Sequence, residues 1–203
     1  MVVGGPIWRA GDPGCADGLA VGVARAGAAG GSDVQIVGKV GDDPEGDQLL
    51  IDLARAGVGH VAVLRDPAAR TPVVGPTADE DDTDDAPAAE LPSGLSLDAT
   101  DLELALRYLT DFRVLVIADA VGADALRVAA DAASFSGAHV VAIVPVGGSV
   151  PPMPPGATIL EGPTGAEVVG FGALVGTYAA AIDRGASPAD AFGQAAVGVG
   201  LEA

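Results

Sequence analysis

Two short apolar runs most constrain the fold of this 203-residue chain. Val114-Leu115-Val116-Ile117-Ala118 and Val140-Val141-Ala142-Ile143-Val144 contain no polar or charged residue. Strands that are apolar throughout are typical of a parallel sheet buried on both faces. The segment from Ala123 to Ala133 between them has helical composition, and parallel strands need such a crossover. The runs therefore predict an α/β fold in which helices cover both faces of a mostly parallel sheet.

The rest of the chain repeats this alternation, so we expect one three-layer α/β/α domain over residues 1–203. Asp43 and Ser187 are the predicted N-caps of two helices, with Pro44 and Pro188 at the first helical positions. In such folds ligands bind at the carboxyl ends of the strands. Further strands are predicted at 2–3, 34–38, 60–64 and 157–160, and further helices at 16–26, 45–55, 98–109, 167–183 and 188–201.

An acidic segment interrupts the pattern at about 77–92, where Asp79 to Asp85 reads Asp-Glu-Asp-Asp-Thr-Asp-Asp. Runs of like charge are usually solvated, which favours an exposed loop. A calcium site is the alternative interpretation, because hard cations prefer carboxylates. The EF-hand spacing is absent, however, and we expect no metal site here.

Composition excludes several classes of function. The formal net charge of −18 repels phosphate backbones, so we expect no nucleic-acid partner. Cys15 is the single cysteine, which excludes an intrachain disulfide and a multi-thiolate zinc site. His60 and His139 have no ligand-spaced partners and read as ordinary strand-boundary residues. Without an apolar run long enough to span a bilayer, we expect a soluble, cytoplasmic protein with no membrane partner.

Several segments occur in the order found in the ribokinase-like (PfkB) carbohydrate kinases, and together they resemble that family. Pro13 to Gly27 is similar to the family's glycine motif and the helix that follows it, and Gly38 to Gly46 is similar to its Gly-x-Val-Gly-x-Asp-x-x-Gly segment. Thr71-Pro72 and Arg184-Gly185 also match. The resemblance implies a ribokinase-like fold. On it we place candidate substrate-binding residues at Asp12, Gly14, Asp17 and Gly38.

The run from Thr164 to Leu174 joins a turn of small residues to an apolar helix, which presents free backbone N–H groups to an anion. It resembles the family's Thr-Gly-Ala-Gly-Asp segment, and the family's catalytic aspartate then falls on Val168. The candidate anion- or nucleotide-binding residues are Thr164, Gly165, Ala166 and Glu167. In an alternative alignment these four residues are a degenerate Asn-x-x-Glu, which makes Glu167 a magnesium-side carboxylate.

Departures from the family indicate lost chemistry. Val168 cannot accept a proton from a substrate hydroxyl. The family's sugar-binding aspartate falls on Arg9 and its motif asparagine on Gly18, and so few residues follow Arg9 that we expect a reduced or missing lid. We therefore expect a catalytically inactive pseudokinase that acts as a binding, regulatory or scaffold protein, forms a homodimer and needs no cofactor. The alternative is an active sugar or nucleoside kinase that uses ATP and magnesium, with Asp12, Asp17 or Glu167 as the base.

Overall fold

The computed structural model describes the whole chain except residues 76–94, 120, 149, 151, 164–167 and 201–203. The predicted acidic loop at 77–92 therefore lies outside the described residues. Six strands form one sheet in the order β5-β4-β1-β7-β8-β9, and all of its neighbours are parallel. The strands are β1 Val2–Val3, β4 Gln35–Gly41, β5 Gly59–Asp66, β7 Val114–Ile117, β8 His139–Pro145 and β9 Thr158–Gly162.

The two apolar runs form β7 and β8, as predicted, and their side chains enter two separate cores. Leu115 belongs to the core on one face of the sheet and Val116 to the core on the other. Alternate residues of a strand point to opposite faces, so a strand buried on both sides has no polar position. This arrangement confirms the predicted parallel sheet covered by helices.

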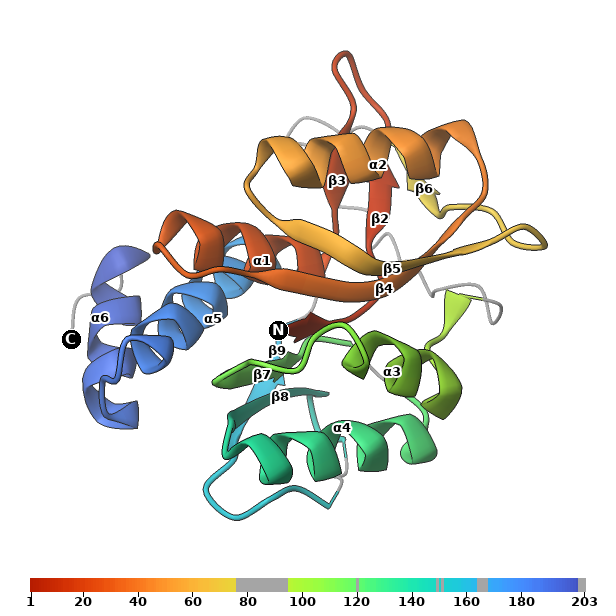
Figure 1. Ribbon diagram of the computed structural model, residues 1–203. Helices are drawn as coiled ribbons and strands as arrows, with labels where there is room; N and C mark the ends of the chain where they lie inside the picture. The colour runs from red at the N-terminus through yellow and green to blue at the C-terminus, as the bar shows by residue number, and fades with distance from the viewer. Residues whose placement is uncertain (76–94, 120, 149, 151, 164–167, 201–203) are drawn as a thin grey trace.

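Helices cover both faces and complete three layers (Figure 1). The core on one face joins residues of α1, α2, α5 and α6, and the core on the other joins residues of α3 and α4. The helices are α1 Leu19–Ala29, α2 Pro44–Arg55, α3 Ala99–Leu106, α4 Ala123–Ser136, α5 Val168–Asp183 and α6 Pro188–Gly198. Within the described residues, no helix combines the length and hydropathy that crossing a membrane requires.

Local capping explains where several helices begin and end. The Asp43 side chain accepts a hydrogen bond from Gly46 N at 2.8 Å and caps α2, as predicted. The Ser187 hydroxyl accepts from Asp190 N at 3.2 Å and caps α6, also as predicted. Helix α4 runs past the predicted end and stops at Gly137, whose φ of 68° is a left-handed conformation suited to glycine.

Helix α3 is fixed at its start by charge as well as by capping. Asp98 and Asp101 form a reciprocal capping box. The Asp101 carboxylate also lies 2.6 Å from Lys39 Nζ of β4, and both side chains are at least four-fifths buried. The one lysine of the chain thus ties α3 to the sheet.

Helices α1 and α5 meet through glycines, which explains how a core with few aromatic residues closes. A Cβ added at Gly172 would lie 3.4 Å from the backbone of Gly22, and one added at Gly176 would lie 2.3 Å from Val23 O. The second distance is far inside van der Waals contact, so only glycine permits this approach. Small residues replace bulky ones at this interface, in line with an aromatic content of 3%.

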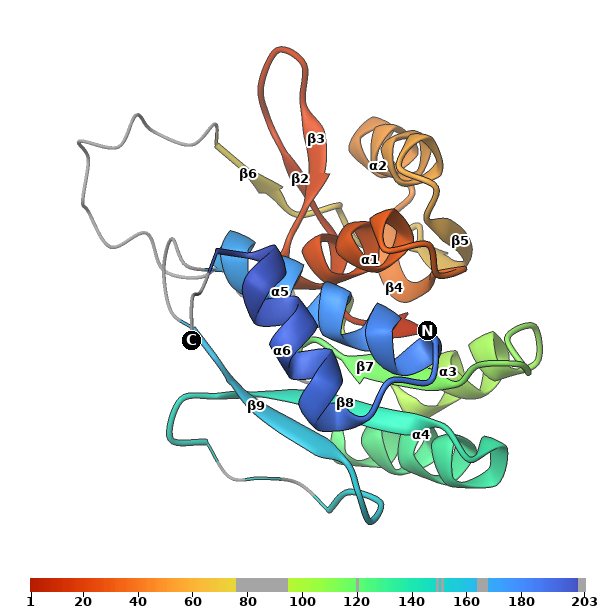
Figure 2. The same cartoon turned by 90° about the vertical axis from the view of Figure 1, so that its left-hand side faces the viewer.

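A second, three-stranded sheet stands beside the large one, in the order β3-β2-β6 (Figure 2). Its strands are β2 Ile7–Arg9, β3 Cys15–Asp17 and β6 Val73–Val74. The predicted helix at 16–26 is wrong at its start, because Cys15–Asp17 pairs with β2 and α1 begins only after Gly18, at a φ of 103°. The residues around Arg9, where we expect a reduced or missing lid, thus form two strands of this small sheet.

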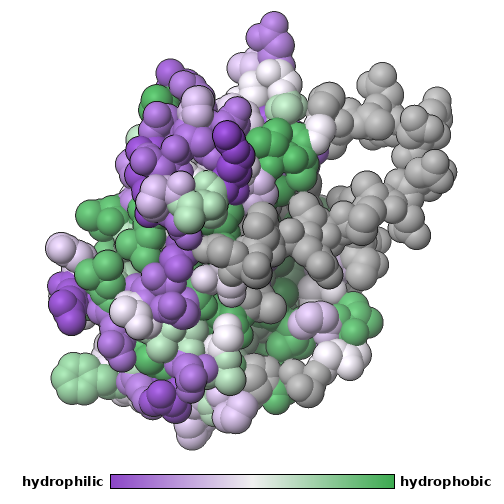
Figure 3. Space-filling model, turned by 90° about the vertical axis from the view of Figure 1, so that its right-hand side faces the viewer, coloured by the Kyte–Doolittle hydropathy of each residue, from purple (hydrophilic) through white to green (hydrophobic). Residues whose placement is uncertain are grey.

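Helix α2 is amphipathic. Its buried side chains include Leu49 and Leu53, whereas its first turn carries Glu45 and Asp47. Figure 3 shows hydrophilic side chains gathered on the upper part of the face it presents, where α2 lies. Arg65 of β5 forms ion pairs there with Asp42 and Asp47.

Candidate functional site

The order of the strands identifies the carboxyl ends of the two central strands as the candidate site. The chain passes from β1 to β4 and β5 on one side, and then crosses to β7, β8 and β9 on the other. The direction reverses between β1 and β7, and in open parallel sheets ligands bind outside the carboxyl ends of the strands at such a switch point. Here those ends are Val3, followed by Gly4-Gly5, and Ile117, followed by Ala118-Asp119.

Asp119 is the acidic side chain at this switch point. Gly5 N donates a hydrogen bond of 2.8 Å to Asp119 Oδ2. A Cβ on Gly4 would lie 2.4 Å from the same oxygen, so the carboxylate occupies the space that a side chain at position 4 would need. Burial raises the pKa of Asp119, and the hydrogen bond from Gly5 offsets part of that rise. A half-buried carboxyl with a perturbed pKa in this position is a candidate for ligand contact.

Glycines let three backbone segments converge beside Asp119. A Cβ on Gly38 of β4 would lie 2.7 Å from Gly4 O and 2.7 Å from Pro6 Cδ. A Cβ on Gly18 would lie 3.3 Å from Gly5 O. Close packing of the chain after β1 accounts for both glycines. The substrate-binding role predicted for Gly38 stays a prediction.

The small sheet holds the other predicted substrate-binding residues. Asp17 forms an ion pair with Arg9 across β2 and β3. Gly14 is required by Trp8, because a Cβ there would lie 2.6 Å from the Trp8 ring atom Cζ2. Asp12 is exposed in the turn between the strands and precedes a cis peptide bond to Pro13. The sequence brings these residues onto one hairpin, but intramolecular partners account for Gly14 and Asp17.

A hydrogen-bonded cluster joins the small sheet to the large one. The Asp43 carboxylate accepts from Thr71 N at 2.7 Å and from Thr71 Oγ1 at 2.6 Å. Thr71 Oγ1 in turn accepts from Gly41 N at 3.0 Å. Thr71 directly precedes Pro72, whose carbonyl accepts from Trp8 N at 2.8 Å. The cluster thereby fixes β6, and with it the small sheet, against the β4–α2 turn.

The predicted anion site, Thr164 to Glu167, lies outside the described residues, as does the alternative magnesium role of Glu167. Val168, the position that the family resemblance gives to the base, lies in α5. No group of three or more histidine, cysteine, aspartate or glutamate side chains suited to a metal ion occurs among the residues whose placement is described.

Sequence reasoning missed Asp119 and Thr71 as site residues. The available signal for Asp119 was its place directly after the apolar run of β7, at the carboxyl end of a parallel strand. Thr71 was noticed only as part of a Thr-Pro pair. Its hydrogen bond to Asp43 spans 28 residues of sequence, so no local sequence pattern predicts it.

Comparisons with known proteins support this architecture. Residues 14–162 match the model of the pfkB family carbohydrate kinases. The match ends before Thr164, so the resemblance of Thr164 to Leu174 to the family's Thr-Gly-Ala-Gly-Asp segment stays a prediction. A search of curated proteins found no match.

Solved structures similar to this chain have low sequence identity and therefore show the fold alone. A protein designated Sa239 is 12% identical with a TM-score of 0.69, over 98% of this chain and 92% of that one. A fructokinase with bound ATP from Xylella fastidiosa is 18% identical with a TM-score of 0.54, over 96% of this chain and 67% of that one.

A sugar kinase from Pyrococcus horikoshii is 15% identical with a TM-score of 0.54, over 70% of this chain. This chain covers only 51% of that kinase. The family match spans most of the sequence, and the fold agrees with it. The chain belongs to the pfkB family of carbohydrate kinases.

Proposed function

We propose that this domain binds a small polyhydroxylated ligand, a sugar or a nucleoside, at the β1–β7 switch point and does not transfer phosphate to it. The observation that supports this proposal is the position of Asp119. Asp119 Oδ2 accepts from Gly5 N, and within the described part of the chain no donor reaches Oδ1. A carboxylate oxygen at a switch point accepts hydrogen bonds from ligand hydroxyls.

The proposed lack of catalysis rests on the groups that would have to act as the base. Val168 is apolar and stands in the base position by resemblance to the family. Asp17, one alternative base, is engaged by Arg9, and Asp12 lies exposed in the hairpin turn. A binding, regulatory or scaffold role needs only the ligand contact and the fold. The homodimer and the absence of a cofactor stay predictions.

Binding and turnover measured on the same preparation test the proposal. Thermal unfolding is followed with fructose, ribose and adenosine, each with and without Mg-ATP, and ADP release is measured in parallel. A ligand at a hundred times its Kd stabilises the folded state by about 2.7 kcal/mol. We expect one ligand class to raise the Tm, with no ADP release above background. No shift with any member of the panel would contradict the proposed binding.

Asp119→Asn tests the site itself. Asparagine keeps the size of the side chain but loses the charge, so we expect the affinity to fall about tenfold, the loss of roughly one charge-assisted hydrogen bond. Asp124→Asn is the matched control, because Asp124 lies on α4 with a side chain that is 86% exposed. Equal binding by the two variants would place the ligand elsewhere.

An active kinase is the second candidate, and Asp119 gives it a specific basis. A general base works best when its pKa approaches the working pH, and burial raises the pKa of this carboxyl. In this case ATP would be the phosphate donor and magnesium would be needed. ADP release that depends on a sugar, persists in Asp124→Asn and disappears in Asp119→Asn would replace the first proposal with this one.

A further inference from the structure

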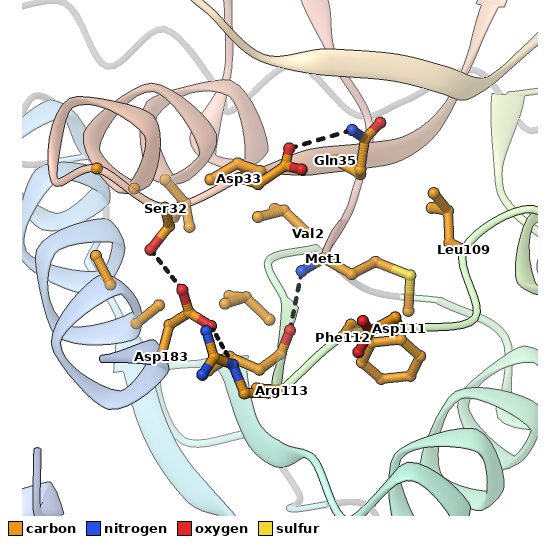
Figure 4. Close-up of a pocket in the computed structure, with 18 residues that line it drawn as sticks. Met1, Val2, Ser32, Asp33, Gln35, Leu109, Asp111, Phe112, Arg113 and Asp183 are labelled. Atoms are coloured by element: carbon orange, nitrogen blue, oxygen red, sulfur yellow. Dashed lines mark hydrogen bonds and ion pairs between the residues drawn. The ribbon is translucent and has the colours of Figure 1, made fainter. Parts of the chain in front are cut away.

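A cavity of about 350 Å³ lies at the amino ends of the central strands, whereas Asp119 lies beyond their carboxyl ends. Helices α1 and α5 and the segment before β7 surround it (Figure 4). Gly27 and Gly31 line it from the α1 side, and Ala179 and Ala180 line it from α5. The two helices stay close here, since a Cβ added at Gly30 would lie 2.9 Å from Ala180 Cβ, so the cavity lies beside their contact, at the amino ends of the strands.

Apolar and polar groups both line the cavity. Valine, leucine and phenylalanine side chains, including Val23 and Phe112, line the interior. Ligand sites of this kind bury an apolar body and orient it with a few polar groups, and volumes of about 300–1,000 Å³ are typical. The polar side chains of the rim are Ser32, Asp33, Gln35, Asp111, Arg113 and Asp183.

One acidic group of the rim is already satisfied. Arg113 Nε lies 3.1 Å from Asp183 Oδ1, and the Ser32 hydroxyl donates to Asp183 Oδ2 at 3.0 Å. The two bonds engage both oxygens of the carboxylate and the Nε of the Arg113 guanidinium. Asp183 therefore holds the loop before β4 and the start of β7 against α5, as the dashed lines in Figure 4 show.

The other two carboxylates are not neutralised. Asp33 Oδ1 accepts only a long hydrogen bond, 3.4 Å, from Gln35 Nε2. Asp111 has neither a hydrogen bond nor an ion pair within the described chain. The α-amino group of Met1 donates to Val114 O at 2.9 Å, and burial lowers its pKa to about 6. With Asp183 paired to Arg113, the carboxylates of Asp33 and Asp111 give the rim a negative charge.

We propose that this cavity is a second ligand site, for a small organic cation with an apolar body. The apolar part enters the cavity at the amino ends of the strands, and the ammonium group stays at the rim in the field of Asp33 and Asp111. An anion of the same shape is repelled by the same two carboxylates. The site is separate from the switch point and does not depend on the function proposed for Asp119.

Three ligands of nearly one shape test the proposal by calorimetry at pH 7.5 and low salt. Phenethylammonium is the cation, 2-phenylethanol the neutral analogue and phenylacetate the anion. We expect the cation to bind at least about tenfold more tightly than the alcohol, and the anion to bind most weakly. Because exposed charges are screened, half-molar salt should remove most of the preference. Equal affinities for the cation and the alcohol at low salt overturn the proposal.

Two sets of variants locate the binding. Asp33→Asn combined with Asp111→Asn should lower the affinity for phenethylammonium about tenfold and leave 2-phenylethanol unchanged. Both positions are exposed, so the fold tolerates the change. Asp124→Asn with Asp131→Asn, on the exposed face of α4, is the control. If the rim and control variants lose affinity equally, the rim does not select the cation.

Ala179→Leu tests whether the interior is used, because Ala179 lines the cavity and a larger side chain there fills part of it. We expect it to abolish binding of both the cation and the alcohol. Ala189→Leu, at an exposed position of α6, is the matched control. Unchanged binding in a folded Ala179→Leu protein contradicts the proposal. If that variant does not fold, the rim variants decide the question.

Discussion

Asp43 and Asp119 both lie just beyond the carboxyl end of a parallel strand, and their surroundings differ in a way that separates structure from function. Asp43 accepts three hydrogen bonds, from Gly46 N, Thr71 N and Thr71 Oγ1. Among the residues that the structure describes, Asp119 accepts one, from Gly5 N. The first carboxylate is saturated by its own chain, whereas the second keeps capacity for a ligand.

The pKa directions follow from these environments. Burial raises the pKa of Asp43, but the hydrogen bonds from Thr71 and Gly46 outweigh burial, and the pKa lies below the ordinary value. For Asp119 the effect of burial exceeds that of the single hydrogen bond, and the pKa lies above the ordinary value. Fully ligated carboxylates stabilise a fold, and under-ligated ones at a switch point are candidates for binding.

The largest expected effect is the loss of the saturated carboxylate. Asp43→Ala removes a helix cap and the acceptor for Thr71, so we expect the free energy of unfolding to fall by about 3 kcal/mol. Urea denaturation followed by circular dichroism measures it. Asp124→Ala, in the exposed first turn of α4, should cost less than about 0.5 kcal/mol. Similar losses in the two variants would show that the cluster does not hold the small sheet.

Thr71→Val tests the same hydrogen-bonded cluster with a smaller change. The variant keeps the shape of the side chain and leaves Gly41 N without its acceptor and Asp43 with one donor fewer. We expect a loss of about 1–2 kcal/mol at an unchanged m-value. Thr100→Val on the exposed side of α3 is a control of the same chemistry. A neutral Thr71→Val would mean that the hydroxyl contributes no net stability.

Asp119→Asn should change stability by less than about 1 kcal/mol, because the carboxyl has one partner and its burial is unfavourable when charged. We expect this substitution to lower the affinity for the ligand instead. Comparing the Tm of the variant with that of the wild type, without ligand, checks this expectation. A loss as large as that of Asp43→Ala would make Asp119 a structural residue like Asp43.

The two carboxyls should also give stability–pH slopes of opposite sign, the smallest effect expected. The pKa of Asp43 is lower in the folded state, so the unfolded chain binds more protons, and this contribution is present above pH 3.8 and lost as pH falls through the folded pKa. The pKa of Asp119 is higher in the folded state, so its contribution to stability falls as pH rises from 3.8 through that value.

Difference curves between wild type and each Asn variant isolate these contributions. They are measured by urea denaturation between about pH 3 and 7, a window that brackets the ordinary carboxyl pKa. The Asp43 curve should rise with pH and the Asp119 curve should fall. Two curves of the same sign would contradict the contrast between the two sites.

What could be predicted from sequence was local. The runs that form β7 and β8 reveal a doubly buried strand without any neighbour, because every residue in them is apolar. The N-caps Asp43 and Ser187 act on backbone groups three residues away and are visible in a short window.

What could not be predicted depends on distant pairing. β2 and β3 have three residues each and β6 has two, too few to show an alternating pattern. Cys15–Asp17 is composed of residues that suit a helix as well as a strand, and only its pairing with β2 makes it a strand. The Gly5–Asp119 hydrogen bond spans 114 residues, so no window on the sequence contains it.

The ion pair between Lys39 and Asp101 has a practical consequence for conjugation chemistry. The Lys39 side chain is 16% exposed, and no other lysine occurs in the sequence. Acylating its ε-amine would remove the charge and leave Asp101 without its cation, so we expect amine-reactive dyes and lysine acetyltransferases to modify the folded protein slowly at this residue. Modification of Lys39 detected by mass spectrometry would accordingly report opening of α3 from the sheet, which makes a single lysine a built-in probe of local unfolding.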